Sequence, residues 1–447
     1  MATRTRLVSG MILVLASAHC ASTTGHRANH DRMRLVSASL ASARPTFVAP
    51  PVVEETFAEL AREIAEHDRA NEGRGDWGPS ACATLAERLE RVARFGPRAT
   101  AGDAYAAALL VHERCNRPER AQAVLARAEA LEPLSCGVLV AIGLAHERAG
   151  RFEVAQRRYA NSFCVEGTVR LGRLSRSLAT KLPPRLAALT RASAITAFRQ
   201  ALRDQPTDPR ALAGLAQVYL DEARANGTPL ALTSAESASA NAVIHARTYP
   251  VDSPAAREEH AHIAHARAEV LAALGRIAPA IDQYRRAVEF APDAYEPRMN
   301  LASLLINSRD FASAADELAI VVQRFPTYDA LVAQGVALAH LGRRGDAEGA
   351  YERARRIEPD RPDVFFNLAV LYAHMGRSLE ELNRGITFAQ VFAQKVQASP
   401  DPQRYAQRVA WIMREAAIVG GRWYRLTGMN AAAAMNAANS QTAPSSP

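Results

Sequence analysis

The chain has 447 residues, of which 48% are hydrophobic and 22% are charged. This length is more than one ordinary hydrophobic core supports, and the composition excludes a disordered chain or a bundle of membrane helices. Basic residues exceed acidic ones by 54 to 46, but arginines alternate with glutamates and only 6% of residues are aromatic. Nucleic-acid binding, which needs clustered cations and stacking aromatics, is therefore disfavoured.

Residues 1–20 have the pattern of an export signal. Arg4 and Arg6 precede a short apolar stretch at 7–15, and the small residues at 16–18 suit a cleavage site. The apolar stretch is too short to span a bilayer, and no long uninterrupted apolar run follows it. We therefore expect an exported protein.

Cys20 lies directly after this signal, in a context that resembles the lipobox of bacterial lipoproteins, in which the cysteine is acylated. His19 departs from that motif, which has a small residue before the cysteine. The resemblance implies a periplasm-facing lipoprotein anchored in the outer membrane, because Ala21 provides no acidic retention signal. Cleavage after Ala18, which would release a soluble periplasmic protein, is the alternative.

The rest of the chain divides by composition and periodicity. We expect a disordered linker at 21–48, an N-terminal helical segment at 49–100, a repeat array at 101–398, a capping helix at 399–428 and a disordered tail at 429–447.

A repeated pattern of small residues, an aromatic or leucine, and a closing proline runs through the array. Its clearest copies lie at 268–292, 299–326 and 335–359, with a period of about 34 residues. The recurring positions are Ala268, Gly275, Ala280, Tyr284, Ala287 and Pro292; Ala302, Ala314, Leu318, Val321 and Pro326; and Gly335, Ala347, Tyr351, Ala354 and Pro359.

This pattern resembles the tetratricopeptide repeat, a pair of antiparallel helices. Small residues are needed where the two helices approach most closely, because a larger side chain there would overpack by about 1–3 kcal/mol. The closing proline ends the second helix. The resemblance implies an all-α solenoid, a right-handed superhelix of stacked helical hairpins.

The other units are less regular. Copies at 104–133 and 142–163 are clear, and 364–377 predicts the first helix of a last unit. The segment near 170–206 is degenerate because two prolines interrupt its first helix. The unit at 209–250 has extra residues, which predict a wider loop or longer helices. About eight units result in total.

Four further cysteines allow three pairings. Cys136 and Cys164 fall at the first and last positions of one repeat, where the two helix ends lie side by side. Cys82 begins one helix, and Cys115 ends the antiparallel helix that follows. We predict disulfides 82–115 and 136–164; buried free thiols are the alternative.

The sequence contains no phosphate-binding loop and no known nucleophile or metalloprotease motif. His262 and His265 share a helical face but lack the further ligands that zinc requires, so we interpret them as exposed histidines. We predict a chain that is not an enzyme and has no metal site and no cofactor.

The remaining candidate is the surface that the first helices of the repeats would form. Tetratricopeptide proteins resembling this chain use five positions of each first helix to line a concave groove. These positions are Glu296, Met299, Ser303, Ile306, Asn307; Asp329, Val332, Val336, Ala339, His340; and Asp363, Phe366, Val370, Ala373, His374. Their apolar floor and acidic rim favour an amphipathic helix or an extended peptide with basic flanks. The alternative is that another helix of the same chain covers them.

A further resemblance extends over the whole chain. Asp76, Trp77, Cys82 and Cys115, followed by tandem repeats behind a lipoprotein-like signal, resemble the tetratricopeptide lipoproteins of myxobacterial adventurous gliding motility. That family implies a scaffold in an envelope-spanning complex, with other envelope proteins as partners. The alternative function is a targeting subunit for a cell-wall enzyme or for a secretion or assembly complex.

Overall fold

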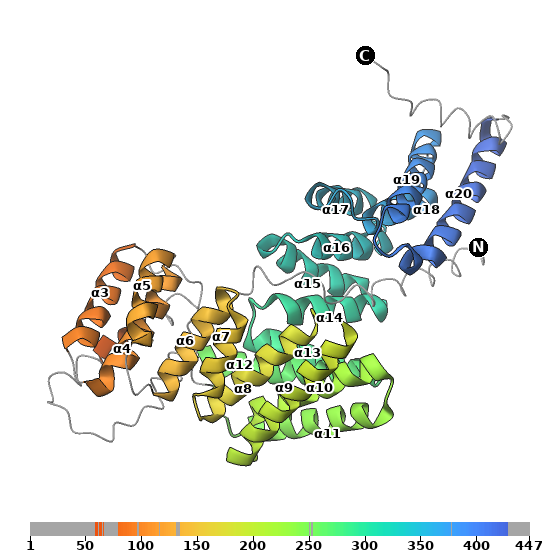
Figure 1. Cartoon of the computed structure of the whole chain (residues 1–447). Coiled ribbons are helices and arrows are strands. Elements are labelled where there is room, and N and C mark those ends of the chain that lie inside the picture. Colours follow the sequence, from red (N-terminus) through yellow and green to blue (C-terminus); the bar gives the residue numbers. More distant parts are fainter. Residues whose placement is uncertain are drawn as a thin grey trace. The chain divides into compact units, whose positions relative to one another are not determined.

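The computed structural model describes residues 79–427, with gaps at 96–97, 116, 131–134, 250, 252–253 and 377, and a few positions between 59 and 66. Every secondary-structure element in these residues is a helix (Figure 1). The predicted all-α fold is therefore confirmed. The export signal with Cys20, the linker at 21–48 and the tail at 429–447 lie outside the described residues.

The described helices fall into two compact units that divide between residues 293 and 294. The N-terminal unit contains α3 (Pro79–Phe95), α4 (Arg98–Arg114), α5 (Pro118–Glu129), α6 (Cys136–Arg148), α7 (Phe152–Ala160), α8 (Val165–Ala179), α9 (Pro184–Asp204), α10 (Pro209–Asn226), α11 (Pro229–Ala246), α12 (Pro254–Ala273) and α13 (Ile277–Phe290).

The C-terminal unit contains α14 (Tyr295–Asn307), α15 (Phe311–Arg324), α16 (Tyr328–His340), α17 (Arg344–Ile357), α18 (Asp363–Met375), α19 (Leu379–Gln397), the short 3-10 helix η4 (Pro402–Tyr405) and α20 (Ala406–Thr427). In both units consecutive helices pack as hairpins, and first helices of neighbouring hairpins also touch, as α14 and α16 do. This is the arrangement of a helical repeat.

The segment near 170–206, expected to be degenerate, is a complete hairpin of α8 and α9. The two prolines do not interrupt a helix: Pro183 caps α9 and Pro184 is its first residue. Proline is suited to that position because the first helical N–H has no intrahelical partner. The extra residues at 209–250 lengthen α10 and α11 to 18 residues each.

The small-residue positions lie where the sequence predicts the closest helix approach. In α16, a Cβ added to Gly335 would lie 2.6 Å from Cδ1 of Tyr351, a fully buried ring in α17. The preceding hairpin places Ala302 and Leu318, both fully buried, at the equivalent positions. Tyr351 is larger than Leu318, so its hairpin requires glycine where the preceding hairpin has alanine.

We expect Gly335→Ala to destabilise the C-terminal unit by about 1–3 kcal/mol through overpacking, although alanine is the better helix former. Gly349→Ala is the matched control, because Gly349 lies on the exposed face of α17 with no atom near its added Cβ. The control should raise stability by up to about 1 kcal/mol. Urea unfolding followed by circular dichroism measures both. Adding Tyr351→Leu to Gly335→Ala should recover part of the loss; equal stability of the two alanine variants would contradict this packing.

Both predicted disulfides are present. Cys82 and Cys115 join the start of α3 to the end of α4, with their Cα atoms 5.9 Å apart. Cys136 and Cys164 join the start of α6 to the residue before α8, at 6.2 Å. Disulfides persist in oxidising compartments, so the two bonds indicate an exported protein. Among the described helices, none is long and apolar enough to cross a membrane.

Candidate functional site

The structure brings the predicted groove residues together along α14, α16 and α18 of the C-terminal unit. We call these positions the first-helix face. Most of its apolar members are already buried: Ile306, Val332, Val336, Phe366 and Val370. The half-buried members with side chains still partly open are Glu296, Met299, Asn307, Asp329, Ala339 and His340, and His374 is exposed.

The last helix of the chain packs on the α18 part of this face. The ring of Trp411 in α20 lies 5.7 Å from that of Phe366 and 6.2 Å from that of His374. Asp363 accepts hydrogen bonds from the Arg408 guanidinium at 2.6 Å and from the Tyr405 hydroxyl at 3.2 Å. A helix of the same chain therefore contacts this end of the first-helix face, through one arginine and aromatic rings.

The charged rim of the face is partly neutralised within the unit. Asp329 accepts a hydrogen bond from Arg361 at 2.6 Å, and the same guanidinium lies over the Tyr328 ring. The His340 ring stacks on Phe311, with centroids 4.0 Å apart. Burial, and then the charge of Arg309, lowers the pKa of His340, so its ring is neutral near pH 7. The open part of the face is consequently mixed: Met299 and Ala339 are apolar, and Glu296 and Asp329 are acidic.

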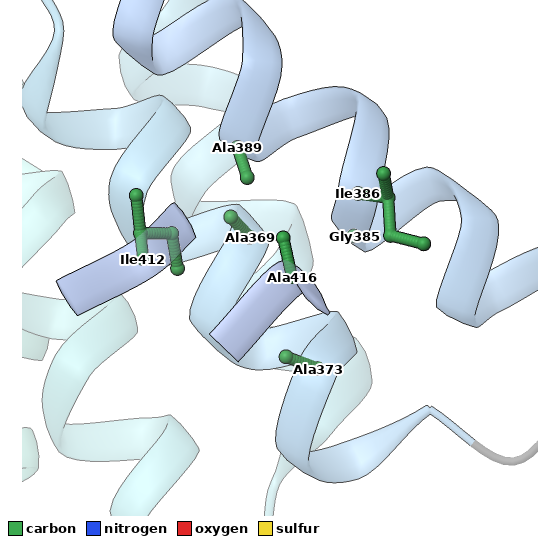
Figure 2. Close-up of a pocket in the computed structure, with 7 residues that line it drawn as sticks. All are labelled: Ala369, Ala373, Gly385, Ile386, Ala389, Ile412 and Ala416. Atoms are coloured by element: carbon green, nitrogen blue, oxygen red, sulfur yellow. The ribbon is translucent and has the colours of Figure 1, made fainter. Parts of the chain in front are cut away.

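One cavity lies beside this face, between α18, α19 and α20 (Figure 2). Its volume is about 10 Å³. It is lined only by Ala369, Ala373, Gly385, Ile386, Ala389, Ile412 and Ala416. Since the space is barely that of one water molecule and offers no side-chain polar group, it is a packing gap rather than a ligand site.

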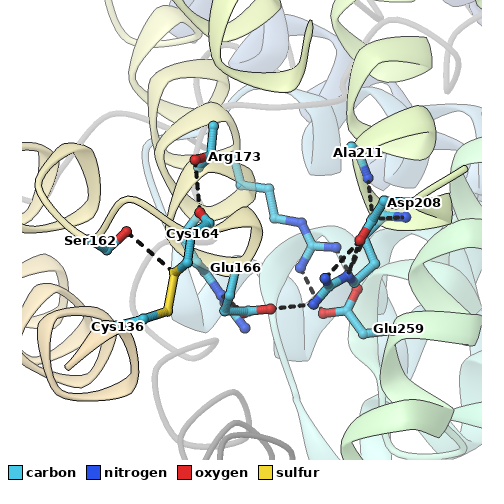
Figure 3. Close-up of polar contacts among 11 residues, drawn as sticks. Cys136, Ser162, Cys164, Glu166, Arg173, Asp208, Ala211 and Glu259 are labelled. Carbon is cyan, nitrogen blue, oxygen red and sulfur yellow. Dashed lines mark hydrogen bonds and ion pairs between the residues drawn. A yellow bond between two sulfur atoms is a disulfide. The ribbon is translucent and has the colours of Figure 1, made fainter. Parts of the chain in front are cut away.

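The N-terminal unit contains a second cluster of functional groups, which the sequence analysis did not find (Figure 3). Arg173 of α8 donates to both carboxylate oxygens of Glu259 in α12, at 2.9 and 2.5 Å. Arg210 of α10 bonds Glu166 of α8 and also Asp208, the residue that caps α10. These ion pairs tie three first helices together.

The pKa values of two carboxylates of α12 are strongly perturbed. Burial acts to raise the pKa of Glu259, but Arg173, followed by Arg210 and Arg170, outweighs it and holds the pKa well below that of a free glutamate. Burial also acts to raise the pKa of Glu269, but electrostatic interactions with His265, Arg176 and Arg224 outweigh it and lower the pKa to about 2. Both groups therefore remain charged in mildly acidic solution.

The histidines of α12 are not the exposed residues that the sequence suggested. His260 and His265 are buried, and their rings lie 5.0 Å from Phe290 and 5.6 Å from Tyr284 respectively. Burial, and then Arg173, lowers the pKa of His262 well below its usual value, so this ring is neutral. No group of metal-binding side chains forms within the residues that the structure describes.

A sequence signal for the titratable residues of α12 exists in the repeat register. With Ala268 at the small position of its repeat, His262, His265 and Glu269 fall at positions that line the groove in the other units. At the equivalent positions of α16, only Asp329 is charged, and Val332 and Val336 are apolar.

A family model described as tetratricopeptide repeat matches residues 186–227 and 299–362 of the chain. These segments cover nearly all of α9 and α10, and the hairpins from α14 to α17 except their first few residues. The chain therefore contains tetratricopeptide repeats, and such repeats form scaffolds for protein–protein interaction. No curated protein matches the sequence.

Several solved structures are similar to parts of the chain. YrrB, a tetratricopeptide protein with an unusual peptide-binding site, is 19% identical over 44% of this chain and 88% of its own, with a TM-score of 0.33. PilF of Pseudomonas aeruginosa is 14% identical over 60% of this chain and 96% of its own, at 0.37. MamA of Desulfovibrio magneticus RS-1 is 14% identical over 41% and 93%, at 0.32. At these scores the likenesses carry no argument about the site.

Proposed function

We propose that this protein is a non-enzymatic scaffold of the bacterial cell envelope that binds another envelope protein on the first-helix face of its C-terminal unit. The observation that carries the proposal is the alignment of half-buried side chains on α14 and α16, from Glu296 and Met299 to Ala339 and His340. Side chains at this level of exposure can still be covered by a partner, whereas the buried members of the face hold the hairpins together.

The contact that α20 makes with α18 indicates the chemistry of a suitable partner. Arg408 pairs with Asp363 while Trp411 lies against Phe366. Asp329 of α16 lies at the repeat position of Asp363, and Met299 of α14 lies at that of Phe366. An amphipathic helix or a peptide with a basic residue and an apolar side chain would therefore make similar contacts with Asp329 and Met299. Such a partner would compete with Arg361 for Asp329.

Two substitutions on the open part of the face test the proposal. Met299→Glu and Ala339→Glu place a charge where an apolar partner group would lie, and neither residue is fully buried. We expect each to lower partner recovery at least tenfold in crosslinking mass spectrometry in the native organism, with circular dichroism unchanged. Gly349→Ala on the exposed side of α17 is the control. Recovery of the same crosslinked partners from all variants would refute binding at this face.

The finer assignment combines the lipobox-like context of Cys20 with the two disulfides. We propose a lipoprotein of the outer membrane that faces the periplasm and takes part in a gliding-motility complex. Metabolic labelling with a fatty acid and cell fractionation, comparing the native chain with Cys20→Ser, test the anchor. A partner set made up of cell-wall enzymes or secretion proteins would instead favour the targeting-subunit alternative.

A further inference from the structure

The turn between α8 and α9 and the start of α9 expose three leucines of the N-terminal unit. Leu182 is 38% exposed, Leu186 50% and Leu189 67%. Leu186 and Leu189 lie on one side of the first turns of α9, where Ala187 faces inward, and Leu182 lies in the turn directly before that helix. We call Leu182, Leu186 and Leu189 with the flanking cations Lys181 and Arg185 the α8–α9 tip.

The tip lies in the most one-sided charge segment of the described chain. Residues 167–203 include no aspartate or glutamate and carry Arg170, Arg173, Arg176, Lys181, Arg185, Arg191, Arg199 and Arg203. The arginines of α8 are bound to carboxylates, as in the pairs of Arg173 with Glu259 and Arg176 with Asp221. The cations at the tip itself, Lys181 and Arg185, are exposed, and the Lys181 ammonium also lies 5.5 Å from the centroid of the Phe152 ring in α7.

We propose that the α8–α9 tip docks on an anionic phospholipid surface. Leucines with adjacent lysine and arginine are the side chains that bind membrane interfaces, because the apolar groups enter the acyl boundary and the cations remain with the headgroups. Each cation near such a surface contributes about 1 kcal/mol. Pro183 and Pro184 restrict the turn between the two helices, so presenting the leucines costs little conformational entropy.

The same observations favour a lipid surface over a protein partner. The leucines lie at the end of a hairpin and project into solvent, so they form no groove for a peptide. A bilayer accepts a projecting apolar tip without a matching pocket.

A fluorophore placed on the tip reports membrane insertion at the leucines themselves, and replacing Cys20 removes acylation from the comparison. The full chain carries Cys20→Ser, which leaves one free thiol when Leu189→Cys is added and both disulfides are formed. A polarity-sensitive dye on that thiol should shift to the blue on adding vesicles of equal parts phosphatidylcholine and phosphatidylglycerol, and not with phosphatidylcholine alone. Ile244→Cys is the matched control, since Ile244 is an exposed apolar residue of α11 outside the tip.

Two further substitutions define the expected effect. Arg185→Glu should raise the lipid concentration at half-maximal shift at least about fivefold, because a favourable charge is replaced by an unfavourable one. Leu186→Ser should raise it about tenfold through loss of apolar burial. A missing shift at residue 189, or equal shifts at residues 189 and 244, would overturn the proposal. So would a crosslink from residue 189 to a protein in cells, combined with no vesicle effect, which would assign the tip to a protein partner.

Discussion

Asp363→Ala is expected to release α20 from the C-terminal unit. The Asp363 side chain is 12% exposed and bonds Arg408, whose side chain is 11% exposed. Removing one partner of such a buried pair leaves an uncompensated charge and costs about 3–5 kcal/mol. Because α20 is the last helix of its unit, the loss should be confined to it and its neighbours. Hydrogen exchange of the amides in residues 406–418 should become faster by two orders of magnitude or more.

An exposed ion pair in the same unit provides the control. Asp360 bonds Lys395 at 2.5 Å, but its side chain is 91% exposed. Asp360→Ala should therefore cost no more than about 1 kcal/mol and leave exchange in α20 unchanged. The double variant Asp363→Asn with Arg408→Met should cost less than Asp363→Ala, since no buried charge remains unpaired. Equal effects of Asp363→Ala and Asp360→Ala would show that α20 is not held by this pair.

The result also bears on the first-helix face. If α20 detaches in Asp363→Ala, then Phe366 and His374 become available to a partner. The alternative raised from the sequence, that a helix of the same chain covers this face, holds for α18 through Trp411. It leaves the half-buried residues of α14 and α16 as the part of the face on which partner binding remains a proposal.

Local sequence patterns were sufficient to predict the hairpins. Gly335 and Tyr351 belong to one hairpin, so their spacing along the chain reports their contact directly. The disulfide between Cys136 and Cys164 follows from the same reasoning, because both residues lie at the boundaries of a single repeat. Where a contact joins positions within one period, the sequence carries the information needed to infer it.

Contacts between distant repeats could not be predicted in this way. Arg173 and Glu259 are 86 residues apart, and their pairing depends on how α8, α10 and α12 stack. The bonds of Arg210 in α10 to Glu166 in α8 depend on the same stacking. A proline pair was misread for a related reason: Pro183 and Pro184 suggest a broken helix until the boundary between α8 and α9 is known. Helix stacking, rather than local propensity, decides these features.

Loss of the two disulfides is expected to destabilise the N-terminal unit by about 3–4 kcal/mol for each bond. The bonds close segments with sequence separations of 33 and 28 residues, and the cross-link limits the conformational entropy of the unfolded segment. In a repeat protein this loss is local, so Cys82→Ser with Cys115→Ser should weaken the hairpins around α3 and α4. Cys136→Ser with Cys164→Ser should weaken those from α6 to α8.

Thermal unfolding with and without a reducing agent measures the effect. The native chain should lose stability on reduction. Each double variant retains one disulfide, so reduction should lower its stability by about half as much as it lowers that of the native chain. The variant that lacks all four disulfide cysteines should not respond to the reducing agent. Hydrogen exchange in α14 to α18, which contains neither bond, serves as an internal control and should be unchanged. If the reducing agent left the stability of the native chain unchanged, a stabilising role of the two disulfides would be contradicted. Since each bond forms only where thiols are oxidised, mass-shift labelling of these cysteines in cells would also show whether the chain is exported.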